Sequence, residues 1–167
     1  MSAPDRILVA GIGNIFLGDD AFGVEVIHEL LRSKLSEGIE VVDFGIRGYD
    51  LAYAIMDGYA ATILVDTASR GNPPGTLYLM ELDQEELRKL EEVAPDGHNL
   101  APVHVLRLVQ SLGGQILSLY LVGCEPAVLE TEDGRIGLSE AVQAAVPQAV
   151  EMIQTLIRDL RAKAAGV

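Results

Sequence analysis

The chain has 167 residues, 49% of them hydrophobic, and its 25 acidic and 12 basic residues give a formal net charge of −13. This size and composition suit one domain with its own core, spanning residues 1–167, and the charge excludes the basic patch that binding to nucleic acid or an anionic membrane requires. The one cysteine, Cys124, excludes an internal disulfide and a metal site built from several cysteines.

We expect a soluble protein in the cytoplasm. The N-terminal residues lack the length and flanks of a signal peptide, and no apolar run approaches the ~20 residues of a membrane helix. A reducing compartment also suits a lone cysteine. The expected partners are proteins, cations or small molecules, with no nucleic acid and no membrane among them.

Five short runs rich in apolar and β-branched residues predict strands, at 6–10, 39–44, 61–66, 77–82 and 116–122. Helical spacing of apolar residues predicts helices at 20–35, 49–58, 84–92, 100–112 and 139–163. Pro147 lacks a backbone N–H, so we expect the last helix to break and to resume at that residue. This alternation predicts an α/β fold, a three-layer αβα domain with a mostly parallel twisted sheet of about five strands.

The first predicted strand leads into the segment GIGNIFLGDDAFGVE, residues 11–25, which is similar to a nucleotide-binding loop. A dinucleotide fingerprint has a third glycine where this chain has Phe16, so we expect the close approach of helix and strand to be blocked. Asp19 and Asp20 would also repel a pyrophosphate at the helix N-terminus. Nucleotide binding is therefore disfavoured, although capping of the helix explains one or both carboxylates.

Another carboxylate, Asp66, ends the third predicted strand, which is otherwise apolar. Because ligands bind at the carboxyl ends of strands in an open parallel sheet, we expect Asp20 and Asp66 to face one crevice. The three histidines differ in their predicted settings. His28 lies in the middle of a helix and is expected at the surface, His98 lies in the loop PDGHNLAP, and His104 lies within the following helix.

Only one histidine of the later pair is expected in the site. His98 and His104 are six residues apart, which is about 240° around a helix, and the loop position favours His98. Two carboxylates and one imidazole suit a divalent ion such as nickel or zinc. A structural trio of helix cap, strand-end acid and loop histidine explains these residue types equally well.

Three residues near the predicted strand ends are weaker candidates. Arg47, in the loop GIRGYDL, could hold a substrate carboxylate or backbone, although a surface turn explains it equally well. Glu125 could line the same crevice or cap a loop. Cys124 lacks the sequence surroundings of a catalytic thiol, so we expect no nucleophilic role for it.

The segments GIGNIFLGDDAFGVEV, ILVDTA, DGHNLAPVHVL and LYLVGCEPAVLE, followed by RIGLSEAV, together resemble the nickel-iron hydrogenase maturation endopeptidases, in order from about Ile7 to Leu160. The resemblance implies a metal-dependent endopeptidase in which Asp20, Asp66 and His98 bind the metal and form the catalytic site. Its implied partner is the precursor of the hydrogenase large subunit, from which it removes a C-terminal extension after nickel insertion. Nickel then arrives with the substrate, and zinc or cadmium are expected to occupy the site in vitro.

The substrate cleft has four candidate residues in addition to this trio: Asn14, Asp19, Arg47 and Glu125. The chain also departs from the family pattern at two places. Many relatives have glycine at the position of Ala21, and Ser-Pro where this chain has Asp96-Gly97. Neither departure removes a ligand, but a glycine before the histidine loosens the loop.

Two other functions fit parts of the sequence. A hydrolase of peptidyl-RNA can also begin with a strand and a Gly-x-Gly-Asn turn, but its substrate requires basic residues and this chain is acidic. A non-proteolytic, nickel-binding assembly factor for the large subunit would need the same three ligands. The sequence does not separate this factor from the protease, because both require the same coordination.

Overall fold

The computed structural model of the chain describes residues 6–13, 18–83, 85, 86, 89, 101–127 and 137–166. The strands are β1 (Ile7–Ile12), β2 (Ile39–Gly45), β3 (Ala61–Thr67), β4 (Leu77–Glu81) and β5 (Leu119–Cys124). The helices are the short 3₁₀ helix η2 (Gly18–Ala21), α1 (Phe22–Arg32), α2 (Gly48–Ile55), α4 (Ala101–Ser111) and α5 (Glu140–Ala164). The predicted elements are confirmed to within a few residues at their ends, except that most of 84–92 lies outside the described residues.

The strands form one sheet in the order β2-β1-β3-β5-β4. β1 pairs in parallel with β2 and β3, and β3 pairs in parallel with β5. Among the described strands only β4, at the edge, is antiparallel to its neighbour. The chain passes to one side of β1 to form β2 and to the other side to form β3. The carboxyl ends of β1 and β3 therefore meet at a topological switch point, where open α/β sheets bind ligands.

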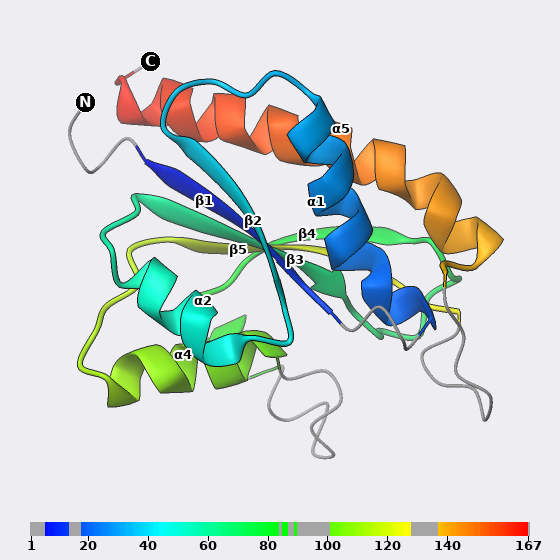
Figure 1. Cartoon of the computed structure of the whole chain (residues 1–167), viewed down its shortest axis with the longest axis horizontal. Coiled ribbons are helices and arrows are strands. Elements are labelled where there is room, and N and C mark those ends of the chain that lie inside the picture. Colours follow the sequence, from blue (N-terminus) through cyan, green and yellow to red (C-terminus); the bar gives the residue numbers. More distant parts are fainter. Residues whose placement is uncertain are drawn as a thin grey trace.

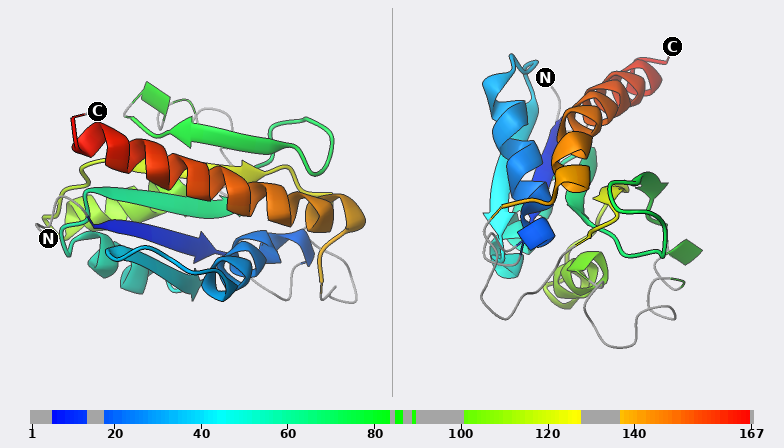
Figure 2. Two further views of the ribbon diagram at one scale, coloured as in Figure 1. Left: turned by 90° about the horizontal axis from the view of Figure 1, so that it is seen from above. Right: turned by 90° about the vertical axis from the view of Figure 1, so that its right-hand side faces the viewer.

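Helices cover both faces of the sheet, as predicted (Figure 1). α1 and α5 pack side by side on one face, and α2 and α4 pack together on the other (Figure 2). Alternate residues of β1 enter the two cores, with Ile7 and Val9 in the α1–α5 layer and Leu8 and Ala10 in the α2–α4 layer. A strand that is buried on both faces must be apolar throughout, which explains the continuous apolar runs in the sequence.

The expected break at Pro147 is wrong, because α5 continues without interruption from Glu140 to Ala164. Pro147 removes one backbone hydrogen bond, but it lies on the exposed side of the helix. Val146 and Ala149, on either side of it, are buried in the same core. We attribute the continuity to this packing, since both halves of the helix gain more from lying on one layer than the lost hydrogen bond costs.

No helix in the described part of the chain is both long and apolar enough to cross a membrane.

Candidate functional site at the carboxyl ends of β1 and β3

A close backbone contact between α1 and the sheet places η2 beside the end of β3. Gly23, the second residue of α1, lies so near the carbonyl oxygens of Ile12 and Val65 that a Cβ atom there would fall 2.4 Å and 2.3 Å from them. Only glycine fits this position. The expectation that the helix cannot approach the strand is therefore wrong: the approach is made at Gly23, while Phe16, on which that expectation was based, lies outside the described residues.

A second glycine fits the end of β1 closely against η2. Gly13 has a φ of +148°, and a Cβ on it would lie 1.9 Å from the carbonyl oxygen of Asp20. Its N–H donates a hydrogen bond to the carbonyl of Gly45, at 3.0 Å. The segment that carries the acidic pair is thus held directly over the sheet edge at which β1, β2 and β3 end.

The carboxylate of Asp66 is buried at this edge, with 7% of the residue exposed. One of its oxygens accepts a hydrogen bond from the backbone N–H of Thr67, at 2.8 Å. Burial raises the pKa of Asp66 well above its ordinary value, the negative charge of Asp20 raises it further, and the Thr67 hydrogen bond opposes both effects. Two acids that are 46 residues apart in sequence therefore lie close enough to interact electrostatically.

A cleft of about 310 Å³ contains both carboxylates. The ends of β1 and β3 form one side of it, and the turn between β2 and α2, together with α4, forms the other. Its lining includes the polar side chains of Asp20, Asp66, Thr67, Arg47 and His104, together with the apolar side chain of Ile46. The prediction that Asp20 and Asp66 face one crevice is confirmed by this shared cleft.

Of the two histidines considered for the site, only His104 lies within the described residues. His98 lies outside the described residues, as does the cleft candidate Asn14. His104, from α4, lines the cleft that contains the two carboxylates, although sequence reasoning ranked it second. Within the described residues, no three His, Cys, Asp or Glu side chains lie close enough together to hold a metal ion. His28 is exposed, as expected, and its Nε2 lies 3.6 Å from Oδ2 of Asp43.

Arg47 combines a place in the cleft with contacts that hold its own turn. Its Nη2 donates to the carbonyl of Asp43 at 2.6 Å, its Nε donates to the carbonyl of Phe44 at 3.2 Å, and its Nη1 lies 3.4 Å from Oδ2 of Asp50. These bonds brace the end of β2 against the start of α2. More than half of the side chain is still exposed, so its guanidinium remains accessible from the cleft.

The neighbouring acid, Asp19, faces away from the cleft toward the start of α5. It is fully buried, and its carboxylate accepts hydrogen bonds from the N–H of Ser139 at 2.7 Å, the hydroxyl of Ser139 at 2.9 Å and the N–H of Ala127 at 2.8 Å. Ser139 is the N-cap residue of α5. A carboxylate there satisfies a donor at the positive end of a helix. The capping role predicted for one of the two acids therefore applies to Asp19, but the helix is α5, whose N-cap lies 120 residues further along the chain.

Glu125 has a similar bracing role at the end of β5. Its Oε1 accepts hydrogen bonds from the N–H of Arg70 at 2.8 Å, the N–H of Asn72 at 3.1 Å and the hydroxyl of Tyr78 at 2.6 Å. Loop capping, one of the two roles considered for it, thus matches its contacts. The adjacent Cys124 is buried, and burial with the nearby acids raises the pKa of its thiol to about 12, which opposes a role as nucleophile.

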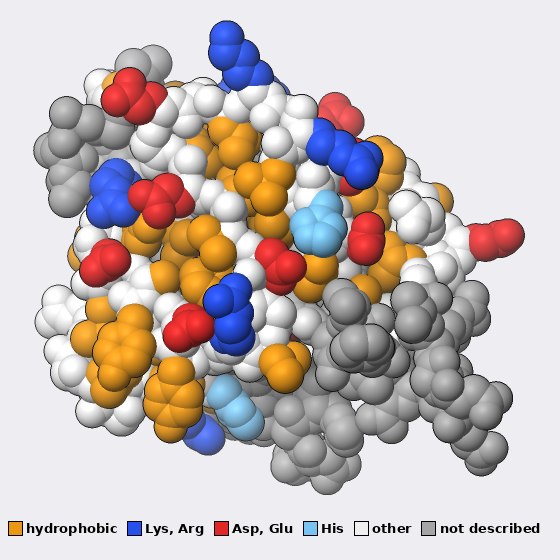
Figure 3. Space-filling model, viewed as in Figure 1, with side chains coloured by type: hydrophobic (Ala, Val, Ile, Leu, Met, Phe, Trp, Pro, Cys, Tyr) orange, Lys and Arg blue, Asp and Glu red, His pale blue; other side chains and the backbone are white. Residues whose placement is uncertain are grey.

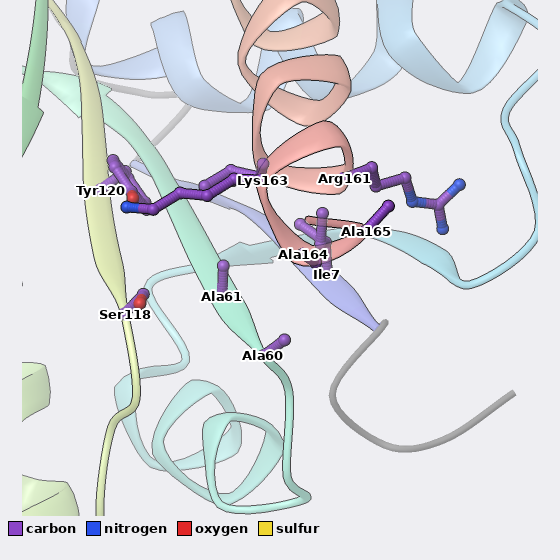
Figure 4. Close-up of a pocket in the computed structure, with 10 residues that line it drawn as sticks. Ile7, Ala60, Ala61, Ser118, Tyr120, Arg161, Lys163, Ala164 and Ala165 are labelled. Carbon is purple, nitrogen blue, oxygen red and sulfur yellow. The ribbon is translucent and has the colours of Figure 1, made fainter. Parts of the chain in front are cut away.

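A larger cavity, of about 450 Å³, lies at the opposite end of the sheet (Figure 4). Its walls are the amino ends of the parallel strands, at Ile7 and Ala61, and the last turns of α5, which contribute Lys163 and Ala164. The described residues that line it include no carboxylate or imidazole. The smaller cleft, with its acidic pair, is therefore the better candidate for chemistry.

Comparison with known proteins identifies one group of relatives. A family model described as hydrogenase maturation protease matches residues 24–156. A putative hydrogenase maturation protease of Methanocaldococcus jannaschii is 32% identical, over 88% of this chain and 93% of its own length. The hydrogenase 2 maturation protease of Escherichia coli is 31% identical, over 92% of both chains.

The fold is also similar to solved structures. The hydrogenase maturating endopeptidase HybD from E. coli aligns with a TM-score of 0.76 and 31% identity, over 92% of this chain and 93% of that one. A hydrogenase maturation protease HycI from Thermococcus kodakarensis, at 23% identity and a TM-score of 0.66, shares the fold. These alignments confirm the predicted three-layer α/β architecture with its mostly parallel sheet of five strands.

Proposed function

This chain belongs to the hydrogenase maturation protease family, and from that membership we propose that it removes the C-terminal extension of a nickel-iron hydrogenase large-subunit precursor after nickel insertion. The observation that carries the proposal is the pairing of Asp20 and Asp66 in one cleft at the switch point of the sheet. Relatives named as proteins of hydrogenase expression and formation in Rhizobium leguminosarum and Cupriavidus necator support the same partner.

The donor set of the cleft fits a divalent cation. A buried carboxylate beside a second carboxylate is costly without a positive charge between or near them, and a cation would relieve that cost. We propose Asp20, Asp66 and His98 as the residues that hold it. The ion is nickel carried by the substrate, and zinc or cadmium would take the same oxygen and nitrogen donors in vitro. In such sites a divalent ion polarises a carbonyl group or a water molecule.

The cleft residues themselves supply the remaining steps of peptide hydrolysis. Water adds its oxygen to the scissile carbonyl carbon and gives a proton to a carboxylate of the acidic pair. The carbon–nitrogen bond then breaks, and the carboxyl group passes that proton to the leaving amine. Arg47, on the facing wall, would hold a backbone carbonyl of the extended substrate segment. Because Asp66 stands on β3 and Asp20 stands on η2, which packs closely against the end of β1 at Gly13, the substrate would meet a preorganised site. We place this reaction in the cytoplasm, where a free thiol such as Cys124 stays reduced.

The proposal is tested by incubating the protein with the nickel-loaded large-subunit precursors of the same organism and measuring their intact mass. The expected result is loss of a C-terminal segment from one precursor. Asp20→Asn, Asp66→Asn and His98→Gln should each slow cleavage by about a hundredfold or more, since each removes a group that acts at the reacting atoms. Asp57→Asn removes the same charge from an exposed loop residue and serves as the matched control.

A nickel-binding assembly factor is the alternative, and the same experiment separates the two. It would bind the precursor and leave its mass unchanged. His104→Gln completes the set, because His104 lines the cleft. If this variant abolished cleavage while His98→Gln processed the precursor at the normal rate, the histidine assignment would have to move to α4.

A further inference from the structure

The outer face of α2 carries two exposed tyrosines. Tyr49 is 64% exposed and Tyr53 is 58% exposed, and their spacing of four residues places both rings on one side of the helix. Ile46, 78% exposed, lies just before the helix. Figure 3, in the same orientation as Figure 1, shows hydrophobic side chains gathered over this part of the surface. We call Ile46, Tyr49 and Tyr53 the α2 ridge.

The α2 ridge lies outside both hydrophobic cores. The opposite side of α2 supplies the buried residues, Leu51, Ala52 and Ile55, which pack in the α2–α4 core. The amphipathic pattern that holds the helix on the sheet is therefore complete without either tyrosine. Large aromatic side chains that are left mostly in water gain little in the isolated protein, and clusters of them mark contact surfaces.

The α2 ridge is continuous with the acidic cleft. Ile46, Arg47 and Gly48 line the cleft and lead directly into the first turn of α2. Arg47 and Asp50, which lie along this stretch, form an ion pair at 3.4 Å, so the ridge has no net charge from them in a chain whose net charge is −13. The ridge therefore offers apolar area and hydroxyl groups, rather than charge, immediately beside the proposed reaction site.

We propose that the α2 ridge is the docking surface for the folded body of the protein whose C-terminal segment enters the cleft. This inference rests on the proposed function, in which that protein is the large-subunit precursor. A cleft of about 310 Å³ holds only a few residues, whereas a specific protein complex buries on the order of 800 Å² on each partner. The adjoining ridge adds exposed apolar side chains to the cleft, and tyrosine is among the residue types that carry most of the binding energy in interfaces.

A second copy of this chain is the other possible occupant, and two features argue against it. A copy seated on the ridge would lie beside the cleft and obstruct the path of the substrate. Two chains that each carry a charge of −13 would also repel each other. The partner surface that fits the ridge is apolar, with acceptors for the two phenolic hydroxyls.

The test compares Tyr49→Ala/Tyr53→Ala with the unchanged protein in steady-state cleavage of the nickel-loaded precursor. We expect KM to rise by at least about tenfold and kcat at saturation to stay within about twofold, because the contact is remote from the reacting bond. Tyr49→Phe/Tyr53→Phe keeps the rings and should recover most of the loss. Leu31→Ala, at a 54% exposed residue on the opposite face of the sheet, should change neither constant.

Binding of the precursor, measured calorimetrically in an Asp66→Asn background with and without the tyrosine changes, separates this inference from the proposed function. Failure of the unchanged protein to cut any precursor would overturn the proposed function, while a tenfold weaker binding of the tyrosine variant would still support the ridge. Equal binding with and without the tyrosines would overturn the ridge. So would a loss of self-association in the variant, measured by sedimentation, with unchanged precursor binding.

Discussion

Replacing Asp19 by alanine tests whether this acid holds the fold together or works in the cleft. From the described residues its carboxylate receives three hydrogen bonds, from the N–H and hydroxyl of Ser139 and from the N–H of Ala127, and it is fully buried. The change leaves the two backbone donors without their acceptor and opens a void beside the start of α5. The donors belong to segments that follow β5 and precede α5. Removing the carboxylate therefore breaks contacts between η2 and parts of the chain that are more than 100 residues away in sequence.

The expected fall in the free energy of unfolding follows from those donors. An unsatisfied donor costs about 1–3 kcal/mol, and the hydroxyl of Ser139 can turn to water, so two donors matter. Because Ala127 and Ser139 are themselves partly exposed, water compensates in part, and we expect the free energy of unfolding to fall by about 2–4 kcal/mol. For a domain of this size that corresponds to a fall of about 4–16 °C in Tm. The loss is a large share of the roughly 5–15 kcal/mol that stabilises an ordinary domain.

Urea and thermal unfolding, followed by circular dichroism, measure this loss directly. Asp57→Ala, which removes an exposed carboxylate, is the control and should stay within about 0.5 kcal/mol of the unchanged protein. Asp19→Asn keeps one acceptor oxygen and should fall between the two. A variant Asp19→Ala that unfolds like the unchanged protein but no longer processes the precursor would refute the bracing role and return Asp19 to the cleft.

Three further changes test the fold and the site. Gly23→Ala should destabilise the protein by about 3 kcal/mol or more in urea unfolding, since a methyl group has no room against the backbone of the sheet; an unchanged midpoint would contradict that contact. Asp66→Asn should raise Tm in the presence of a chelator. Because folding raises the pKa of Asp66, the unchanged protein loses stability as pH rises above the ordinary pKa of aspartate. The gain should therefore be absent near about pH 4 and grow as the pH rises; a gain of constant size would exclude titration of this group as its cause. Pro147→Ala should raise the unfolding free energy by about 1–3 kcal/mol, because it restores a backbone hydrogen bond on the exposed side of α5, and a loss of stability would show that the proline is needed there.

Local pattern was sufficient to predict the elements of the fold and part of the site. Strands that are buried on both faces must be apolar throughout, so β1 and β3 could be predicted from continuous runs of apolar residues. Asp66 was recognised as the acid that ends such a run. The parallel order of the strands then implied that Asp20 and Asp66 would meet, because the carboxyl ends of parallel strands share one edge. Family resemblance added the roles that we propose for these residues, which no periodicity contains.

Other features depended on contacts between distant segments, which a local pattern does not encode. Asp19 and Asp20 are adjacent in sequence, yet one turns toward the start of α5 and the other into the cleft. Gly23 makes the close approach to the sheet that a fingerprint places earlier in the chain, because α1 begins only after η2. Pro147 stays inside a continuous helix because the core on either side of it holds both halves in place.

The sequence by itself therefore determined which residues are strands, helices and candidate acids, since these follow from the spacing of apolar groups along a few turns or pleats. Only the tertiary structure decided which side chain faces which neighbour. That choice depends on packing between segments that are far apart in the sequence. Gly23 contacts the end of β3, 42 residues away, and Asp19 contacts Ser139, 120 residues away.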